Sequence, residues 1–209
     1  MSGEPDGVER IDRVMRWAGR GAAVVLFVAA GAFSWIMAGA FLSGVGAADA
    51  APRDLCSLVA SEQWRGIVPA ARVSHHTGPR HDVRNDAECE VTGRDGEKAR
   101  GRYGRMHAYL DRHGATRYGS GWEGARKTYD WLREDAAGDG STPREVRGLG
   151  EQAFAEARSA ASDGARAEAE VTVLLGRDVL TIEYAAEPSS PERAREVAVA
   201  VATTMLAKL

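Results

Sequence analysis

The chain has 209 residues, with 27 basic and 30 acidic side chains and a net charge of −3. This near-balance excludes the strongly basic surface that nucleic-acid binding requires, so we expect no nucleic-acid partner. The length allows one domain with its own hydrophobic core in addition to a membrane segment.

An apolar segment, residues 21–45, contains no ionisable side chain. About 20 apolar residues in a helix cross the roughly 30 Å hydrocarbon core of a bilayer, where only a helix or closed barrel satisfies its own backbone. The sequence therefore predicts one N-terminal transmembrane helix. It divides the chain into a segment 1–20, the span 21–45, a linker 46–53 and a domain 54–209.

The arginines around this span predict its orientation. Four precede it, at positions 10, 13, 16 and 20, whereas Arg53 and Arg65 are the first to follow it. The positive-inside rule then places the N-terminus in the cytoplasm and the C-terminal domain outside the cell membrane. Ala48-Asp49-Ala50 is compatible with signal-peptide cleavage, but the span is longer than a signal h-region, which favours an uncleaved anchor. Both alternatives export the domain.

The cysteines, Cys56 and Cys89, both lie in the exported part. In an oxidising compartment such a pair is expected to form a disulfide. Lipidation of Cys56 would need small residues before it, and Arg53-Asp54-Leu55 do not meet that requirement.

The first half of the domain is expected to begin with a helix from Leu55 to about Val68, capped by Asp54 and ended by Pro69. Residues 71–101 are polar and rich in Gly, Pro and Arg, which predicts a long excursion that the disulfide ties to this helix. A strand through Cys89 is also expected, although the pattern marks it weakly.

Residues 103–112 alternate between apolar and polar side chains, which indicates a half-buried strand. Ser120 and Glu123 then form a capping box that opens a helix ending near Gly138. Its expected core stripe consists of Trp122, Ala125, Tyr129, Leu132 and Ala136. Trp131 falls opposite that stripe, so it is either an exposed candidate partner anchor or buried beneath the 71–101 segment.

The sequence of the second half of the domain predicts several strands followed by a final helix. Gly148-Leu149-Gly150 introduces a short strand around 153–155, and residues 166–175 alternate with Ala167, Ala169, Val171, Val173 and Leu175 on one face. Gly176-Arg177 suits a hairpin turn into a return strand, 179–185. Ser190 caps a last helix with Pro191 at its first position. The predicted fold class is α+β, an antiparallel sheet packed with helices.

These features together resemble a family of small actinobacterial exported domains. The resemblance rests on Asp54-Leu55-Cys56, on Cys89 and on Gly-Leu-Gly-Glu-Gln-Ala-Phe at 148–154, followed by the hairpin and terminal helix. Members are usually lipoproteins with a conserved disulfide and are often compared with PsbP-like folds. Two departures are the span in place of a lipobox and Glu90 where an aromatic residue would follow the second cysteine. The resemblance implies a fold and a compartment, and no catalytic residues.

Three histidines, His75, His76 and His81, lie near Asp82 and Asp86 in the polar segment. Imidazole and carboxylate groups bind zinc or copper, but adjacent histidines rarely chelate one ion together. We therefore favour a solvated loop over a metal site, and expect no metal and no cofactor.

His107 and Tyr109 share the polar face of the 103–112 strand, and His113 follows shortly after. No nucleophile motif, metal motif or phosphate loop accompanies them. We therefore expect a non-enzymatic binding module with a cell-envelope protein or lipid partner, and a cell-envelope hydrolase is the alternative. A pocket around His107 with a paired acid would favour the enzyme, and a flat face or apolar groove the binding module.

Overall fold

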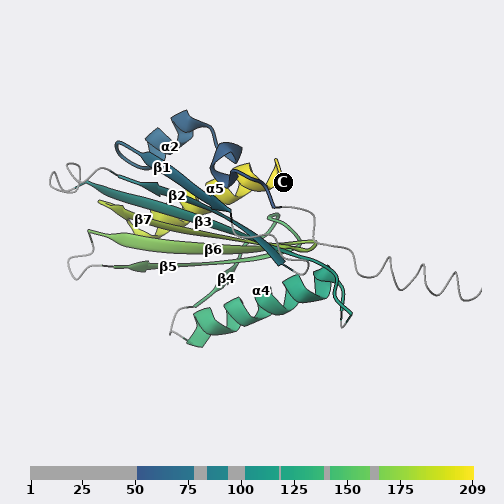
Figure 1. Cartoon of the computed structure of the whole chain (residues 1–209). Coiled ribbons are helices and arrows are strands. Elements are labelled where there is room, and N and C mark those ends of the chain that lie inside the picture. Colours follow the sequence, from purple (N-terminus) through teal and green to yellow (C-terminus); the bar gives the residue numbers. More distant parts are fainter. Residues whose placement is uncertain (1–50, 78–83, 94–101, 118, 139–141, 161–164) are drawn as a thin grey trace, which may run out of the picture. The chain divides into compact units, whose positions relative to one another are not determined.

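The computed structural model describes residues 51–77, 84–93, 102–117, 119–138, 142–160 and 165–209. It confirms an α+β domain built on a seven-stranded antiparallel sheet in the order β1-β2-β3-β7-β6-β5-β4 (Figure 1). The predicted transmembrane segment 21–45 lies outside the described residues, and remains a prediction. Among the helices that are described, none is both long and apolar enough to cross a membrane.

The elements in chain order are η1 (Leu55–Leu58), α2 (Ser61–Ile67), β1 (Arg72–Thr77), β2 (Arg84–Thr92), β3 (Tyr103–His113), α4 (Gly121–Gly138), β4 (Arg144–Glu145), β5 (Gln152–Ser159), β6 (Ala167–Leu175), β7 (Asp178–Glu187) and α5 (Pro191–Leu206).

The single helix predicted after Asp54 is wrong, because the chain breaks it into the 3-10 turn η1 and the helix α2. The Ser57 N–H donates to Asp54 Oδ1 at 3.1 Å, and this cap closes a 3-10 turn. Val59 is extended (φ −115°, ψ 131°) and ends that turn. The indole N–H of Trp64 donates to the Cys56 carbonyl oxygen at 3.2 Å, so α2 folds back onto η1.

The predicted strand through Cys89 is confirmed as β2, but the rest of the long excursion predicted for 71–101 is wrong, because this segment also contributes β1, which pairs with β2. β1 lies at the edge of the sheet, and its one large apolar side chain, Val73, is 48% exposed. An edge strand with little to bury has no hydrophobic alternation, which is why the pattern did not reveal it. The two-residue strand β4, at the other edge, was not predicted either.

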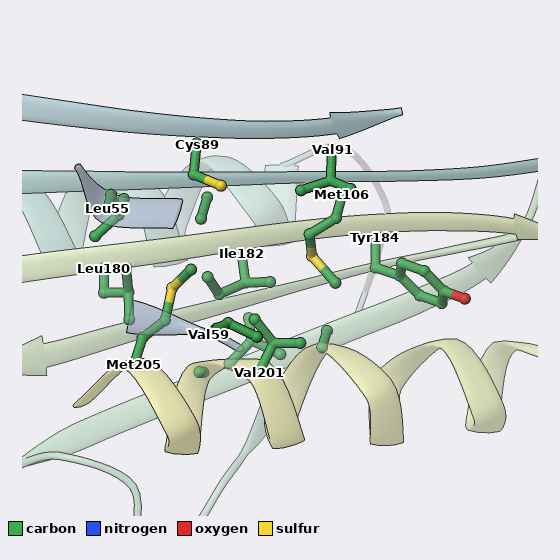
Figure 2. Close-up of a cluster of buried hydrophobic side chains, with 14 of the residues drawn as sticks. Leu55, Val59, Cys89, Val91, Met106, Leu180, Ile182, Tyr184, Val201 and Met205 are labelled. Carbon is green, nitrogen blue, oxygen red and sulfur yellow. The ribbon is translucent and has the colours of Figure 1, made fainter. Parts of the chain in front are cut away.

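One face of the sheet carries the main core, which η1, α2 and α5 cover (Figure 1). Figure 2 shows side chains of η1, the strands and α5 meeting there, among them Leu55, Met106, Ile182 and Val201. The predicted start of α5 is confirmed, since the Arg193 N–H donates to Ser190 Oγ at 3.2 Å.

On the opposite face, α4 is the helix that packs against the sheet among the described elements, and it covers one part of that face. The predicted capping box is present: the Ser120 N–H donates to Glu123 Oε2 at 2.7 Å, and the Glu123 N–H to Ser120 Oγ at 3.2 Å. A second small core joins α4 to one end of the sheet through Ala125, Tyr129, Phe154, Leu174 and Val179. Beyond this end, the face carries polar side chains.

Two residues depart from the predicted faces. Trp122 was expected in the core stripe of α4, but it is 42% exposed and its indole N–H donates to Glu151 Oε2 at 3.3 Å. Leu175 was expected on the apolar face of its strand with Val171 and Val173, but it is exposed at the end of β6, while Leu174 is buried in the second core.

Candidate functional site

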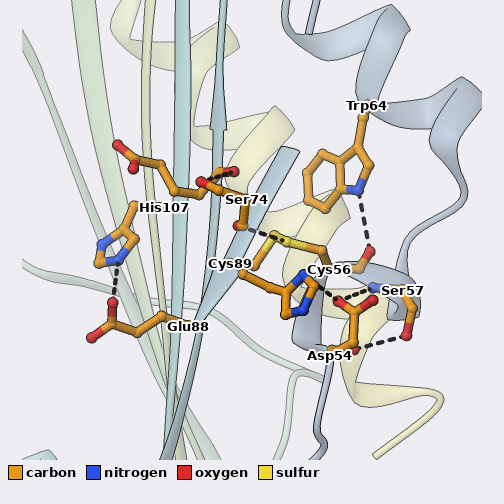
Figure 3. The surroundings of a disulfide bond; sticks show 10 residues. Asp54, Cys56, Ser57, Trp64, Ser74, Glu88, Cys89 and His107 are labelled. Carbon is orange, nitrogen blue, oxygen red and sulfur yellow. Dashed lines mark hydrogen bonds and ion pairs between the residues drawn. A yellow bond between two sulfur atoms is a disulfide. The ribbon is translucent and has the colours of Figure 1, made fainter. Parts of the chain in front are cut away.

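The predicted disulfide is confirmed. Cys56 of η1 and Cys89 of β2 are bonded, with their Cα atoms 5.0 Å apart, and both are buried (Figure 3). The bond anchors η1 to β2, the second strand from one edge of the sheet, on the main-core face. Its role is structural, because both sulfur atoms are consumed in the bond.

The functional candidate lies on the polar face, and the strand register builds it. His107 of β3 lies opposite Glu183 of β7. Glu183 in turn lies opposite Glu170 of β6, and Glu170 lies opposite Glu156 of β5. Directly opposed residues in an antiparallel sheet project from the same face. His107 also lies opposite Glu90 of β2. We call the line of these five residues, which crosses five strands, the acid row.

A second line of residues runs parallel to the acid row and is displaced from it by two residues on each strand. Arg105 pairs in register with Ala185, Ala185 with Glu168, and Glu168 with Arg158. We call Arg105, Arg158 and the nearby Arg166 the arginine row. Parts of the two rows, together with Tyr103 and Tyr184, line a depression of about 340 Å³.

His107 lies between two carboxylates, those of Glu88 and Glu183. Its Nε2 lies 3.8 Å from Glu88 Oε2 and its Nδ1 lies 3.8 Å from Glu183 Oε2, which are ion-pair distances (Figure 3 shows the Glu88 pair). The interaction with Glu183 raises the pKa of His107 above its ordinary value. The same interaction lowers the pKa of the Glu183 carboxyl, so that group stays ionised at neutral pH.

Glu170, the neighbour of Glu183, behaves in the opposite way. Burial is the largest cause that raises its pKa, to about 7, and repulsion from Glu183 and Glu156 adds to it. Thr172 Oγ1 donates a hydrogen bond to Glu170 Oε1 at 3.4 Å, which offsets only part of the rise. Because the two pKa values are displaced in opposite directions, Glu170 can act as a proton donor near neutral pH while the adjacent Glu183 is an anion.

The arginine row is held by ion pairs within the same face. Arg166 Nη2 lies 2.7 Å and Arg158 Nη2 lies 3.4 Å from the carboxylate of Glu168. The Arg166 guanidinium also stacks over the Tyr103 ring, 4.7 Å from its centroid. Arg105 Nη2 lies 3.2 Å from Glu90 Oε1, so one contact links the two rows directly.

The other polar residues singled out in the sequence do not join this site. Tyr109 accepts a hydrogen bond from Arg84 Nη2 at 3.4 Å. His113 lies beneath α4, where its Nε2 is 3.2 Å from Asp111 Oδ2 and 3.3 Å from Thr128 Oγ1. His107, Tyr109 and His113 therefore do not converge on one reacting centre.

The histidine cluster takes a different form from the one predicted. His75 belongs to β1 rather than to a flexible loop, and its Nδ1 lies 3.9 Å from Asp54 Oδ1. His76 is also part of β1, whereas His81 and Asp82 lie outside the described residues. Within the part of the chain that the structure describes, no three metal-binding side chains come together.

Trp131 on α4 is 60% exposed. The alternative that it lies buried beneath the 71–101 segment is therefore wrong, since β1 and β2 pair into the sheet instead.

No model of a protein family matches the chain, and no curated protein matches it. The resemblance to exported actinobacterial domains consequently remains a prediction, and the case for a function depends on the geometry of the polar face.

Proposed function

We propose that the chain is a membrane-anchored, extracytoplasmic binding module whose ligand site is the depression at the acid row. The apolar segment 21–45 with its preceding arginines supports the anchor and its orientation. The disulfide between Cys56 and Cys89 supports the compartment, because such bonds persist mainly in oxidising surroundings.

The observation that carries the proposed site is the arrangement of Glu156, Glu170 and Glu183 on three adjacent strands. Like charges directly opposite each other destabilise a sheet, and this repulsion adds to burial in raising the pKa of the central carboxyl, that of Glu170, to about 7. A positively charged nitrogen placed among them would relieve the repulsion and let Glu170 ionise. We therefore propose a ligand that carries at least one ammonium group.

The test uses n-butylamine and its uncharged analogue n-butanol with the full-length protein in detergent micelles. The ring signal of His107, assigned through His107→Gln in a histidine-labelled sample, reports on the site by NMR. We expect n-butylamine to shift this signal saturably and n-butanol not to shift it. The amine should bind more weakly at pH 6 than at pH 8, because Glu170 is protonated at the lower pH. Equal shifts with the alcohol, or no saturable shift with the amine, would contradict the proposal.

A cell-envelope hydrolase is the second candidate, and one observation favours it. Glu170 holds a proton near neutral pH while the neighbouring Glu183 is ionised. Acid–base catalysis uses such a pair, with the protonated carboxyl as the acid and the ionised one as the base. Chromogenic glycosides and esters provide the test. Turnover that Glu170→Gln and Glu183→Gln each abolish, with folding intact, would replace the binding module by the enzyme.

The anchor and a partner contact have separate tests. Protease added to intact protoplasts should digest a C-terminal tag, and protection of that tag would contradict the proposed orientation. Trp131 is proposed to contact a cell-envelope protein or lipid. A photo-crosslinking residue at position 131 should label one of these classes in envelope membranes, and the absence of any product would count against the contact.

A further inference from the structure

The charges that line the depression fall into two rows, and each row has one sign of charge in excess. On β3, Arg105 precedes His107 by two residues, and on β5, Arg158 follows Glu156 by two. Residues two apart on a strand share a face and lie about 7 Å apart. The depression therefore has an acidic side and a basic side at that spacing.

Each side holds an excess of its own charge. Two guanidinium groups, those of Arg158 and Arg166, share the single carboxylate of Glu168. The Nε of Arg166 is buried and makes no hydrogen bond to any described residue. The opposite side carries the three opposed carboxyls of Glu156, Glu170 and Glu183, beside the one imidazole of His107 that is paired with Glu183. A simple cation would satisfy only the acidic side, and a simple anion only the basic side.

We infer that the ligand is zwitterionic, with its ammonium at the acid row and its carboxylate at the arginine row. This inference rests on the proposed function and names the chemistry of the same site. It explains why two rows of opposite excess charge lie side by side in one depression, since each row satisfies one end of the ligand.

The spacing narrows the class of zwitterion further. In a single α-amino acid the two charged groups are attached to the same carbon atom, too close to reach both rows. Two residues of extended chain span about 7 Å, so the ends of an unblocked dipeptide match the separation of the rows. The volume of about 340 Å³ lies within the range of small-molecule sites. The geometry therefore favours a free dipeptide or an amino acid with an equally distant amine.

Three forms of one molecule test the inference: the dipeptide Ala-Ala, its N-acetyl form and its C-terminal amide. Calorimetric titration of the full-length protein in micelles at pH 8 compares their affinities. We expect Ala-Ala to bind at least about tenfold more tightly than either blocked form, because each blocked form loses one charge-assisted contact. Variants then assign the two ends. Arg166→Gln should remove the preference over the amide, Glu170→Gln should reduce the preference over the N-acetyl form, and Glu196→Gln on α5 should change neither.

The outcomes separate the inference from the proposal on which it rests. If the amide binds as tightly as Ala-Ala, the carboxylate is not recognised, and the zwitterion inference fails while the ammonium site stands. If the N-acetyl form binds as tightly, the ammonium is not recognised and both fail. If neither Ala-Ala nor n-butylamine binds, the depression is not a ligand site for cationic groups, and both fail. The comparison of ligands uses the unaltered protein, so it does not depend on how well a variant folds.

Discussion

Glu170→Gln tests the central physical claim about the acid row. The carboxyl pKa is raised from 4.5 to about 7, so the folded protein keeps this proton to a higher pH than the unfolded chain does. Glu170 therefore lowers the free energy of unfolding progressively as the pH rises from about 4.5 through 7. At about 1.36 kcal/mol per pH unit, the loss reaches about 3 kcal/mol at pH 8 but remains below about 1 kcal/mol at pH 5.

Glutamine resembles the protonated carboxyl and cannot ionise. We therefore expect Glu170→Gln to raise the free energy of unfolding by up to about 3 kcal/mol at pH 8, and by less than about 1 kcal/mol at pH 5. Equilibrium urea unfolding at both pH values measures the difference. The matched control is Glu196→Gln on α5, whose exposed ion pair with Arg193 is expected to contribute less than about 1 kcal/mol at either pH. An equal effect of Glu170→Gln at both pH values, or a loss of stability at pH 8, would refute the claim that burial and repulsion between the strands together raise the pKa of Glu170.

Three further predictions concern stability. Cys89→Ser should lower the free energy of unfolding by about 2–4 kcal/mol, and a reducing agent should have no additional effect on that variant. Gly148 and Gly150 both have positive φ, but an added Cβ meets nothing within 4 Å at Gly148, whereas at Gly150 it would lie 2.5 Å from a side chain of β6. Gly148→Ala should therefore cost about 1 kcal/mol, and Gly150→Ala clearly more; equal losses would contradict this reading. Trp131→Ala should change stability by less than about 0.5 kcal/mol, while Trp64→Ala, in the buried core, should cost about 3–5 kcal/mol; a large loss at Trp131 would show that it is not a free surface residue.

The elements that the sequence predicted well are those with a local chemical cause. Ser120 with Glu123 and Ser190 with Pro191 mark helix starts through short-range hydrogen bonds and a fixed φ. Residues 103–112 and 166–175 bury one face along most of their length, so their alternation is visible. β1 lacks both signals, because its pairing with β2 comes from tertiary structure and its edge position leaves it little to bury.

The candidate site was only partly accessible from the sequence. The polar face of β6, including Glu168 and Glu170, was visible in the alternation. The two-residue turn at Gly176-Arg177 also fixes the hairpin register, since counting back from it pairs Glu170 with Glu183. No local pattern reveals that His107 lies beside Glu183, because β3 and β7 are distant in the chain. The shifted pKa of Glu170 depends on burial and on both neighbouring strands, which only the assembled sheet provides.

The pairing of β3 with β7 at the middle of the sheet has a consequence for how the domain is made. β3 ends at His113, and the strand that completes its hydrogen bonds begins only at Asp178. A nascent chain synthesised from its N-terminus must therefore hold two incomplete half-sheets, each with an open edge, until the C-terminal strand emerges. The part of the apolar face that α5 covers stays uncovered longer still, since α5 follows β7. Such long-range closure is slow and exposes edges that can aggregate. The Cys56–Cys89 bond joins two residues of the N-terminal half of the domain, so it can stabilise that half before the C-terminal half has been synthesised.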